Sequence, residues 1–236
     1  MAEKEKWSAR TEMLIGKEGS ARLAGARVAV FGVGGVGGYV VEALARAGVG
    51  ALDLFDNDTV SETNRNRQII ALCSTVGKYK TDVARDRVLD INPDAKIEVR
   101  HLFFTTENAN EVDFSVYDYV VDAIDTVSAK MELIRRCKAV GTPIICSLGT
   151  GNKLNPMGFR VSDLEKTSVC PLARTVRGLC RKEGIKGVKV VWSAEPPIRV
   201  SLPEEHGRHA PGSISFVPAA AGLCIASEVV RDLLRQ

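Results

Sequence analysis

A glycine-rich turn between an apolar run and a segment with helical spacing restricts the fold of this chain more than any other feature. Residues 27–33, RVAVFGV, are nearly all apolar and do not alternate, which indicates a strand buried on both faces of a parallel sheet. Residues 32–37 read GVGGVG, and apolar residues then recur at helical spacing up to Ala47. A second expected strand, ALDLFD, covers 51–56 and ends at Asp56. This order predicts one strand–helix–strand unit with a right-handed crossover.

Strand and helix patterns continue to alternate up to about residue 150. Expected strands cover 96–104, 117–124 and 143–149, and expected helices cover 80–91, a short stretch near 107–112, and 128–140. Repeated units of this kind favour a sheet with helices on both faces. We therefore expect an α/β fold with a Rossmann-like, doubly wound and mostly parallel sheet.

The pattern changes after Gly151. Two expected strands, 159–164 and 189–193, flank a basic helix over 172–184, and a loop over 203–213 precedes a buried terminal helix over 216–230. We expect residues 1–236 to form a single domain, with a core over 10–150 and a specialised C-terminal extension over 151–236. The conformation of the loop 201–212 is not specified by the sequence.

Composition and cysteine spacing exclude several classes. Apolar residues make up 45% and charged residues 26%, and the formal charge is +3, which neither requires nor excludes nucleic acid. No apolar run approaches the roughly 20 residues that span a bilayer, and the N-terminus has no signal-peptide pattern, so a cytoplasmic protein without a membrane partner is expected. The six cysteines form no CxxC pair, which argues against a zinc ribbon, and we expect them to be packing residues.

The glycine turn predicts a nucleotide site. Small residues let the backbone approach a phosphate at the start of a helix, and Asp56, about twenty residues further on, can accept hydrogen bonds from a ribose. These two features suit NAD as well as ATP. A triphosphate also needs cations and a metal-binding carboxylate, which Arg67, Lys80 and Asp125 could supply. Taken singly, each has a simpler explanation, since the two cations could be solvated surface charges and Asp125 could cap the next helix.

A set of short motifs resembles the ubiquitin-activating-like adenylating superfamily, which includes ThiF and MoeB. The motifs are Gly32 to Gly37, Asp56-Asn57-Asp58-Thr59-Val60, Asn64, Arg67-Gln68, Lys80, Ile91-Asn92-Pro93 and Asp122-Ala123-Ile124-Asp125. Within that superfamily, residues 117–130, 162–185 and 189–197 are similar to the tRNA threonylcarbamoyladenosine dehydratases.

The resemblance implies a reaction and a set of site residues. The reaction is ATP-dependent cyclisation of threonylcarbamoyladenosine next to the anticodon of tRNA, by adenylation of the threonyl carboxylate, with ATP and Mg²⁺ as cofactors. Arg67, Lys80 and Asp125 would be catalytic, and Asp125 would hold the metal. The implied nucleotide-binding residues are Gly32, Gly34, Gly35, Gly37, Asp56, Asn64, Arg67, Gln68, Lys80 and Arg10. Arg10 would act in the partner's site of a homodimer.

Three alternatives follow from the same residues. An activating enzyme for a ubiquitin-like sulfur carrier would adenylate a protein carboxylate, but such relatives usually carry two CxxC pairs. An NAD-dependent oxidoreductase would leave Arg67, Lys80 and Asp125 unexplained, and a non-catalytic nucleotide sensor would not need the full set. Some dehydratases have a longer C-terminal extension than this chain. Whether a cysteine desulfurase or a sulfur acceptor associates is left open.

A basic helix predicts the tRNA contact. Arg174, Arg177 and Arg181 are spaced i, i+3 and i+7, so one helix face presents all three to backbone phosphates. Such a face is often only solvated. Its position directly after the nucleotide-binding core favours tRNA binding.

Overall fold

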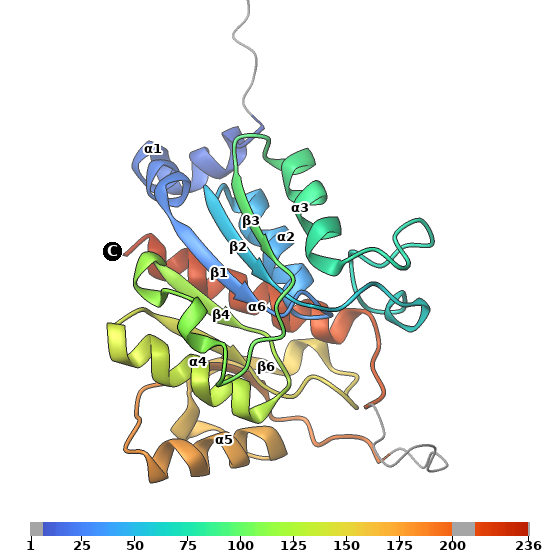
Figure 1. Ribbon diagram of the computed structural model, residues 1–236, viewed down its shortest axis with the longest axis vertical. Coiled ribbons are helices and arrows are strands. Elements are labelled where there is room, and N and C mark those ends of the chain that lie inside the picture. The colour runs from blue at the N-terminus through green and yellow to red at the C-terminus, as the bar shows by residue number, and fades with distance from the viewer. Residues whose placement is uncertain (1–6, 200–210, 236) are drawn as a thin grey trace, which may run out of the picture.

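A seven-stranded sheet forms the centre of the computed structural model, which describes residues 7–199 and 211–235 (Figure 1). Its strands are β1 (Arg27–Phe31), β2 (Ala51–Phe55), β3 (Lys96–Arg100), β4 (Tyr119–Asp122), β5 (Ile144–Ser147), β6 (Phe159–Asp163) and β7 (Lys189–Ser193). The order is β3-β2-β1-β4-β5-β7-β6, and every neighbouring pair is parallel except β6 with β7. The predicted Rossmann-like, mostly parallel α/β fold is confirmed.

Helices cover both faces of the sheet, as the doubly wound prediction requires. They are α1 (Ala9–Gly25), α2 (Gly37–Ala47), α3 (Lys80–Ile91), α4 (Val127–Val140), α5 (Pro171–Lys182) and α6 (Phe216–Leu233). One core joins the sheet to α2, α3 and α6, and a second core joins the other face to α4 and α5. In β1, Val28 and Val30 belong to the first core, whereas Ala29 and Phe31 belong to the second. Because successive side chains point to opposite faces and both faces are covered, this strand is apolar from Val28 to Phe31.

Several predicted strands end earlier than the sequence pattern suggested. β1 stops at Phe31 because Gly32 has a φ of 88°, which turns the chain out of the sheet. β3 stops at Arg100, so residues 101–104 are free to cross the carboxyl edge of the sheet. The expected helix near 107–112 is a short 3-10 turn, Ala109–Glu111.

Helix α1 has no counterpart in the sequence-based expectations. Its chain is kinked at Gly16, where φ is 75° and ψ is 171°. The kink interrupts the periodicity that would have revealed a helix over residues 9–25, since the two halves present different faces. Leu23 is the fully buried apolar residue that attaches its second half to the core.

The C-terminal extension continues the same sheet. β7 pairs with β5 in parallel, and β6 adds an antiparallel edge strand. α5 packs beside α4, whereas α6 packs against α2 on the opposite face. Of the expected loop over 203–213, residues 203–210 lie outside the described part of the chain.

Candidate active site

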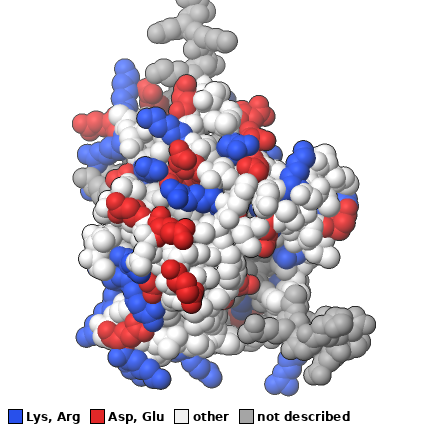
Figure 2. Space-filling view, in the orientation of Figure 1, with Lys and Arg blue, Asp and Glu red and all other residues white. Residues whose placement is uncertain are grey.

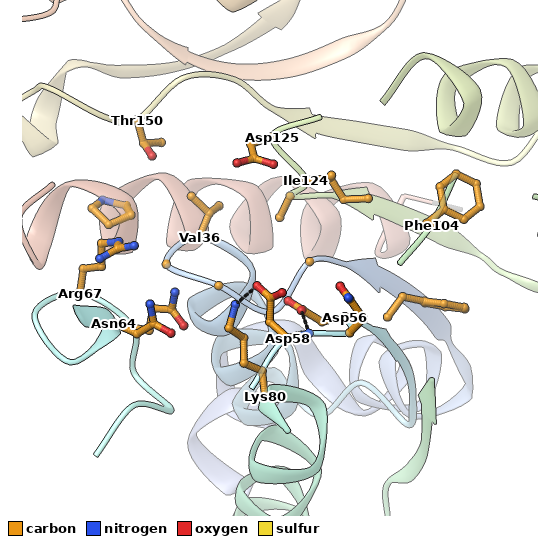
Figure 3. Close-up of a pocket in the computed structure, with 18 of the residues that line it drawn as sticks. Val36, Asp56, Asp58, Asn64, Arg67, Lys80, Phe104, Ile124, Asp125 and Thr150 are labelled. Carbon is orange, nitrogen blue, oxygen red and sulfur yellow. Dashed lines mark hydrogen bonds and ion pairs between the residues drawn. The ribbon is translucent and has the colours of Figure 1, made fainter. Parts of the chain in front are cut away.

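A pocket lies at the carboxyl edge of the sheet, next to the point where strand order reverses (Figure 3). The chain leaves β1 at Gly32, β2 at Asp56 and β4 at Ala123, and all three residues line the pocket. Its volume is about 380 Å³. This is the place where open α/β sheets bind ligands, and the volume falls within the usual range for small-molecule sites.

The glycine turn forms one wall of this pocket. Gly34 and Gly35 line it, and within residues 7–199 and 211–235 no acceptor receives a hydrogen bond from their N–H groups. Gly32 has a φ of 88°, and a Cβ atom there would lie 2.8 Å from the carbonyl oxygen of Ala123. Free N–H groups at the start of α2 suit an anion such as a phosphate.

Gly37 has a different position from the one that the nucleotide motif implied. It does not line the pocket, and a Cβ atom on it would lie 1.8 Å from the carbonyl oxygen of Gly32. The residue therefore allows the first turn of α2 to pack against the end of β1. Its contribution to a nucleotide site is indirect, through the shape of the turn.

Asp56 fixes the glycine turn to the end of β2. One carboxylate oxygen accepts a hydrogen bond from the N–H of Val33 at 2.8 Å, and the other accepts one from the N–H of Asp58 at 2.9 Å. Each carboxylate oxygen has a second lone pair. The side chain is half-buried and lines the pocket, so it retains acceptor capacity for the hydroxyl groups of a ribose.

Lys80 is a buried cation at the start of α3. Only 6% of the residue is exposed, and its Nζ donates to Asp58 Oδ2 at 2.5 Å. The Asp58 side chain is 59% exposed, so this partner can move away at little cost. Because the Asp58 carboxylate is open to solvent, its attraction to Lys80 is weakened by the surrounding water. Lys80 is thus available to a phosphate in the pocket.

A 3-10 turn, Glu62–Asn64, and the residues after it supply three polar side chains to the pocket, those of Asn64, Arg67 and Gln68. Arg67 donates from Nη1 to the carbonyl oxygen of Thr63 and to Asn66 Oδ1, both at 2.9 Å. Gln68 is 7% exposed, and its Oε1 is buried with no hydrogen-bond partner among the described residues. A buried polar atom without a partner is costly, so Gln68 is poised for a bound ligand.

Asp125 faces the pocket from the loop after β4, on the opposite side from Lys80 (Figure 3). Helix α4 begins at Val127 with Thr126 at the N-cap position. The Asp125 carboxylate accepts a 3.5 Å hydrogen bond from the Thr126 hydroxyl and does not cap the helix. The simpler explanation of this carboxylate as a capping group therefore does not hold.

The structure brings most of the predicted site residues to one pocket. Those that line it are Gly32, Gly34, Gly35, Asp56, Asn64, Arg67, Gln68, Lys80 and Asp125. Arg10 is exposed on α1 and lies outside the pocket of its own chain, as an arginine that serves a partner's site would have to.

Other lining residues escaped the sequence reasoning. Phe103 and Phe104 follow β3, Thr150 follows β5, and Pro218 comes from α6. Thr150 could have been found, since it lies just beyond a strand end that shares the edge with Asp125. Pro218 could not, because it reaches the turn only through the packing of α6 against α2.

The ThiF family matches residues 8–236, which is nearly the whole chain. The chain belongs to the ThiF family. It is 44% identical to the tRNA threonylcarbamoyladenosine dehydratase of Bacillus subtilis, over 96% of this chain and 94% of that protein. The corresponding Escherichia coli enzyme is 38% identical over 78% of this chain and 72% of its own length.

Two solved structures of this ThiF-family enzyme from E. coli show the same fold. TcdA in complex with AMP superposes with a TM-score of 0.88 at 34% identity and covers 100% of this chain and 98% of its own. TcdA in complex with ATP gives 0.87 at 33% identity with the same coverage. The resemblance derived from the sequence motifs is confirmed.

The basic face of α5 is only partly free. Arg174 and Arg181 are exposed, whereas Arg177 donates from Nη1 to the carbonyl oxygen and to the hydroxyl of Thr167, at 2.7 and 2.6 Å. Lys and Arg side chains gather along the lower edge of the molecule, where Figure 1 places α5 (Figure 2). Arg177 thus holds the loop before α5, and the other two arginines face solvent.

The cysteines do not assemble a second reactive site. Burial raises the pKa of Cys137 to about 12 and raises the pKa values of Cys146, Cys180 and Cys224. A thiol with a raised pKa is a poor nucleophile. Packing is therefore the role of the buried cysteines. The expectation of packing is wrong for Cys73, which is exposed and does not line the pocket.

Proposed function

We propose that this chain is an ATP-dependent tRNA threonylcarbamoyladenosine dehydratase. The observation that carries the proposal is the convergence of the glycine turn, two cations and a separate carboxylate in one pocket, in a chain that matches such a dehydratase over almost its entire length. The threonyl carboxylate attacks the α-phosphorus of ATP, and pyrophosphate leaves. The carbamoyl group then closes the ring and releases AMP, with net loss of water from the nucleoside.

The pocket residues act by positioning and electrostatics. The N–H groups of Gly34 and Gly35 donate hydrogen bonds to phosphate oxygens, and the Asp56 carboxylate accepts hydrogen bonds from the ribose hydroxyl groups. Arg67 and Lys80 offset the charge that develops on the leaving pyrophosphate. To do so, Lys80 breaks its ion pair with Asp58 and pairs with a phosphate group instead. Gln68 Oε1, which has no partner among the described residues, accepts a hydrogen bond from the bound nucleotide. No protein nucleophile is needed, because ring closure within one nucleoside benefits from a high effective concentration.

The charges that line the pocket fit a divalent cation. Three carboxylates, Asp56, Asp58 and Asp125, oppose two cations, Arg67 and Lys80, so a polyphosphate would enter a pocket with a formal excess of negative charge. Among the described residues no group of three His, Cys, Asp or Glu side chains could hold a metal alone. Mg²⁺ usually binds through one or two carboxylates together with substrate phosphates. We therefore assign Asp125 as its protein ligand, where the ion would neutralise phosphate charge.

The reaction is tested with purified protein, ATP, MgCl₂ and tRNA that carries threonylcarbamoyladenosine. We expect the nucleoside released by digestion to be lighter by one water, with one AMP formed for each ring closed. Mass spectrometry of the digested tRNA measures the loss of water, and chromatography of the reaction mixture before digestion measures AMP. Unchanged nucleoside, together with adenylation of a protein that ends in Gly-Gly, would instead identify an activating enzyme for a sulfur carrier.

The exposed arginines of α5 give a testable tRNA interface. In the double variant Arg174→Gln/Arg181→Gln we expect weaker tRNA binding and a slope of log K against log salt that is shallower by about 1.4–1.8, because each phosphate contact contributes about 0.7–0.9. ATP affinity should not change. Filter binding over a salt series measures the slope.

The matched control neutralises two cations at the other edge of the sheet. Lys17 and Lys96 are exposed and line a separate cavity beside α1 and the start of β3. Lys17→Gln/Lys96→Gln should leave the slope unchanged. Equal slopes for both double variants would remove α5 from the interface.

Three further assignments complete the proposal. The active form is a homodimer, in which Arg10 reaches the partner's pocket.

The enzyme works in the cytoplasm, where its tRNA substrate is found. Across residues 7–199 and 211–235, no helix has the length and apolarity to cross a membrane. A cysteine desulfurase or a sulfur acceptor is a partner to be sought by affinity capture.

A further inference from the structure

Lys130 is a buried cation that the reaction described above does not use. It lies in the first turn of α4, and both it and Asp122 have 0% side-chain exposure. Its Nζ donates to Asp122 Oδ2 at 2.6 Å and to the carbonyl oxygen of Ser147 at 3.0 Å. Asp122 is the last residue of β4 and Ser147 is the last residue of β5. One ammonium group therefore ties together the ends of two neighbouring strands.

Stability alone does not account for this lysine. A positive charge in the first turn of a helix opposes the helix dipole, which favours anions there. Moving two charges out of water is also costly, and buried ion pairs can often be replaced by apolar residues of similar size without loss of stability. The directional property of the pair is what apolar packing cannot reproduce, since hydrogen bonds fix both distance and angle.

The hydrogen bonds of this pair continue into the pocket. Asp122 Oδ1 accepts from the N–H of Ile124 at 3.1 Å, so the carboxylate that holds Lys130 also shapes the turn leading to Asp125. The carbonyl oxygen of Ala123 in this turn lies against Gly32. The second hydrogen bond of Lys130, to Ser147, also leads to the pocket. Thr150 follows Ser147 by three residues and lines the pocket (Figure 3).

We propose that Lys130 is a positioning residue for the adenylation step. Through Asp122 and Ser147 it fixes the distance between the turn that carries Asp125 and the loop that carries Thr150. The inference rests on the proposed function, because this distance is the one that ATP and the substrate carboxylate require. Lys130 itself lies outside the pocket.

The test replaces the whole pair, since removing one partner would strand a buried charge. In Lys130→Met/Asp122→Leu we expect a thermal midpoint close to that of the wild type, because apolar packing offsets the loss of the pair and of its hydrogen bonds to Ile124 and Ser147. Turnover should fall by about 10–100-fold, the range found when groups that orient ligating residues are removed, and KM for ATP should change by less than about threefold. The split between kcat and KM separates positioning from loss of the binding pocket.

Hydrogen–deuterium exchange gives a second readout that does not depend on activity. Residues 123–125 and 148–150 should exchange faster in the double variant, whereas the start of α2 should not change. If wild-type protein fails to dehydrate its nucleoside, the proposed function fails, and the exchange comparison still tests the pair. The inference is overturned if the folded double variant has the same exchange and turnover as the wild type. It is also overturned if the thermal midpoint of the variant falls by a large amount, because the pair would then serve stability.

A second, partly exposed ion pair provides a control. Arg27 donates to both carboxylate oxygens of Asp53 at 2.9 Å, and the Tyr117 hydroxyl also donates to Asp53 at 2.9 Å. The Asp53 side chain is 1% exposed and the Arg27 side chain 39%. This pair joins β1 to β2 and does not line the pocket. Arg27→Met/Asp53→Leu should keep turnover and leave exchange at 123–125 unchanged. An equal loss of turnover in both double variants would show that any disturbed strand pair has this effect, and would overturn the special role of Lys130.

Discussion

Gly37→Ala is expected to destabilise the protein by about 3 kcal/mol and to abolish ATP binding. The added methyl group would lie 1.8 Å from the carbonyl oxygen of Gly32, and that oxygen belongs to backbone that is held between β1 and α2. Relief requires the first turn of α2 to move, and overpacking of this kind costs about 1–3 kcal/mol. For a chain of 236 residues the midpoint of thermal unfolding should fall by roughly 6–12 °C.

Gly34→Ala is the matched control in the same turn. A Cβ atom at Gly34 would lie 3.7 Å from Gln68 Nε2, which is an ordinary contact. Its thermal midpoint should therefore stay near that of the wild type. Calorimetry measures both midpoints, and titration with ATP measures binding. If Gly37→Ala unfolds at the wild-type temperature, the close contact between the turn and the end of β1 does not exist in solution.

Asp125→Asn is expected to lower turnover by about 10²–10³-fold with little change in stability. The residue is exposed, does not cap α4, and is the carboxylate that we assign to Mg²⁺. Removing one group that stabilises charge in a transition state has an effect of about this size. The Mg²⁺ concentration for half-maximal turnover should rise, because asparagine keeps the shape of the side chain and loses its charge.

Asp90→Asn is the control for that variant. Asp90 is exposed near the end of α3 and lines neither the active-site pocket nor the cavity beside α1. Its turnover should stay within about twofold of the wild type, since surface substitutions of this kind have small effects. Measured rates across a Mg²⁺ series compare the two variants. Wild-type turnover and an unchanged Mg²⁺ requirement in Asp125→Asn would exclude this carboxylate from the reaction.

The sequence by itself determined the fold class and nine of the residues that line the pocket. Apolar runs and helical spacing report local backbone preferences, which act over a few residues and are readable without a structure. Parallel strands also place their carboxyl ends along one edge, so residues just after strands, such as Asp56 and Asp125, had to meet there. Arg67 and Lys80 lie on no strand end, and it was the resemblance to known motifs that assigned them to the same site.

Only the tertiary structure decided which side chains pair with one another. The bond of Lys80 to Asp58, the anchoring of Arg177 on Thr167 and the link from Lys130 to two strand ends depend on distances between segments that the sequence does not encode locally. Helix α1 was missed because the kink at Gly16 breaks its period. Gly37 belongs to a nucleotide-binding motif, but in the structure it allows close packing against Gly32. A motif specifies residue type and spacing, whereas the tertiary structure determines which neighbour the residue contacts.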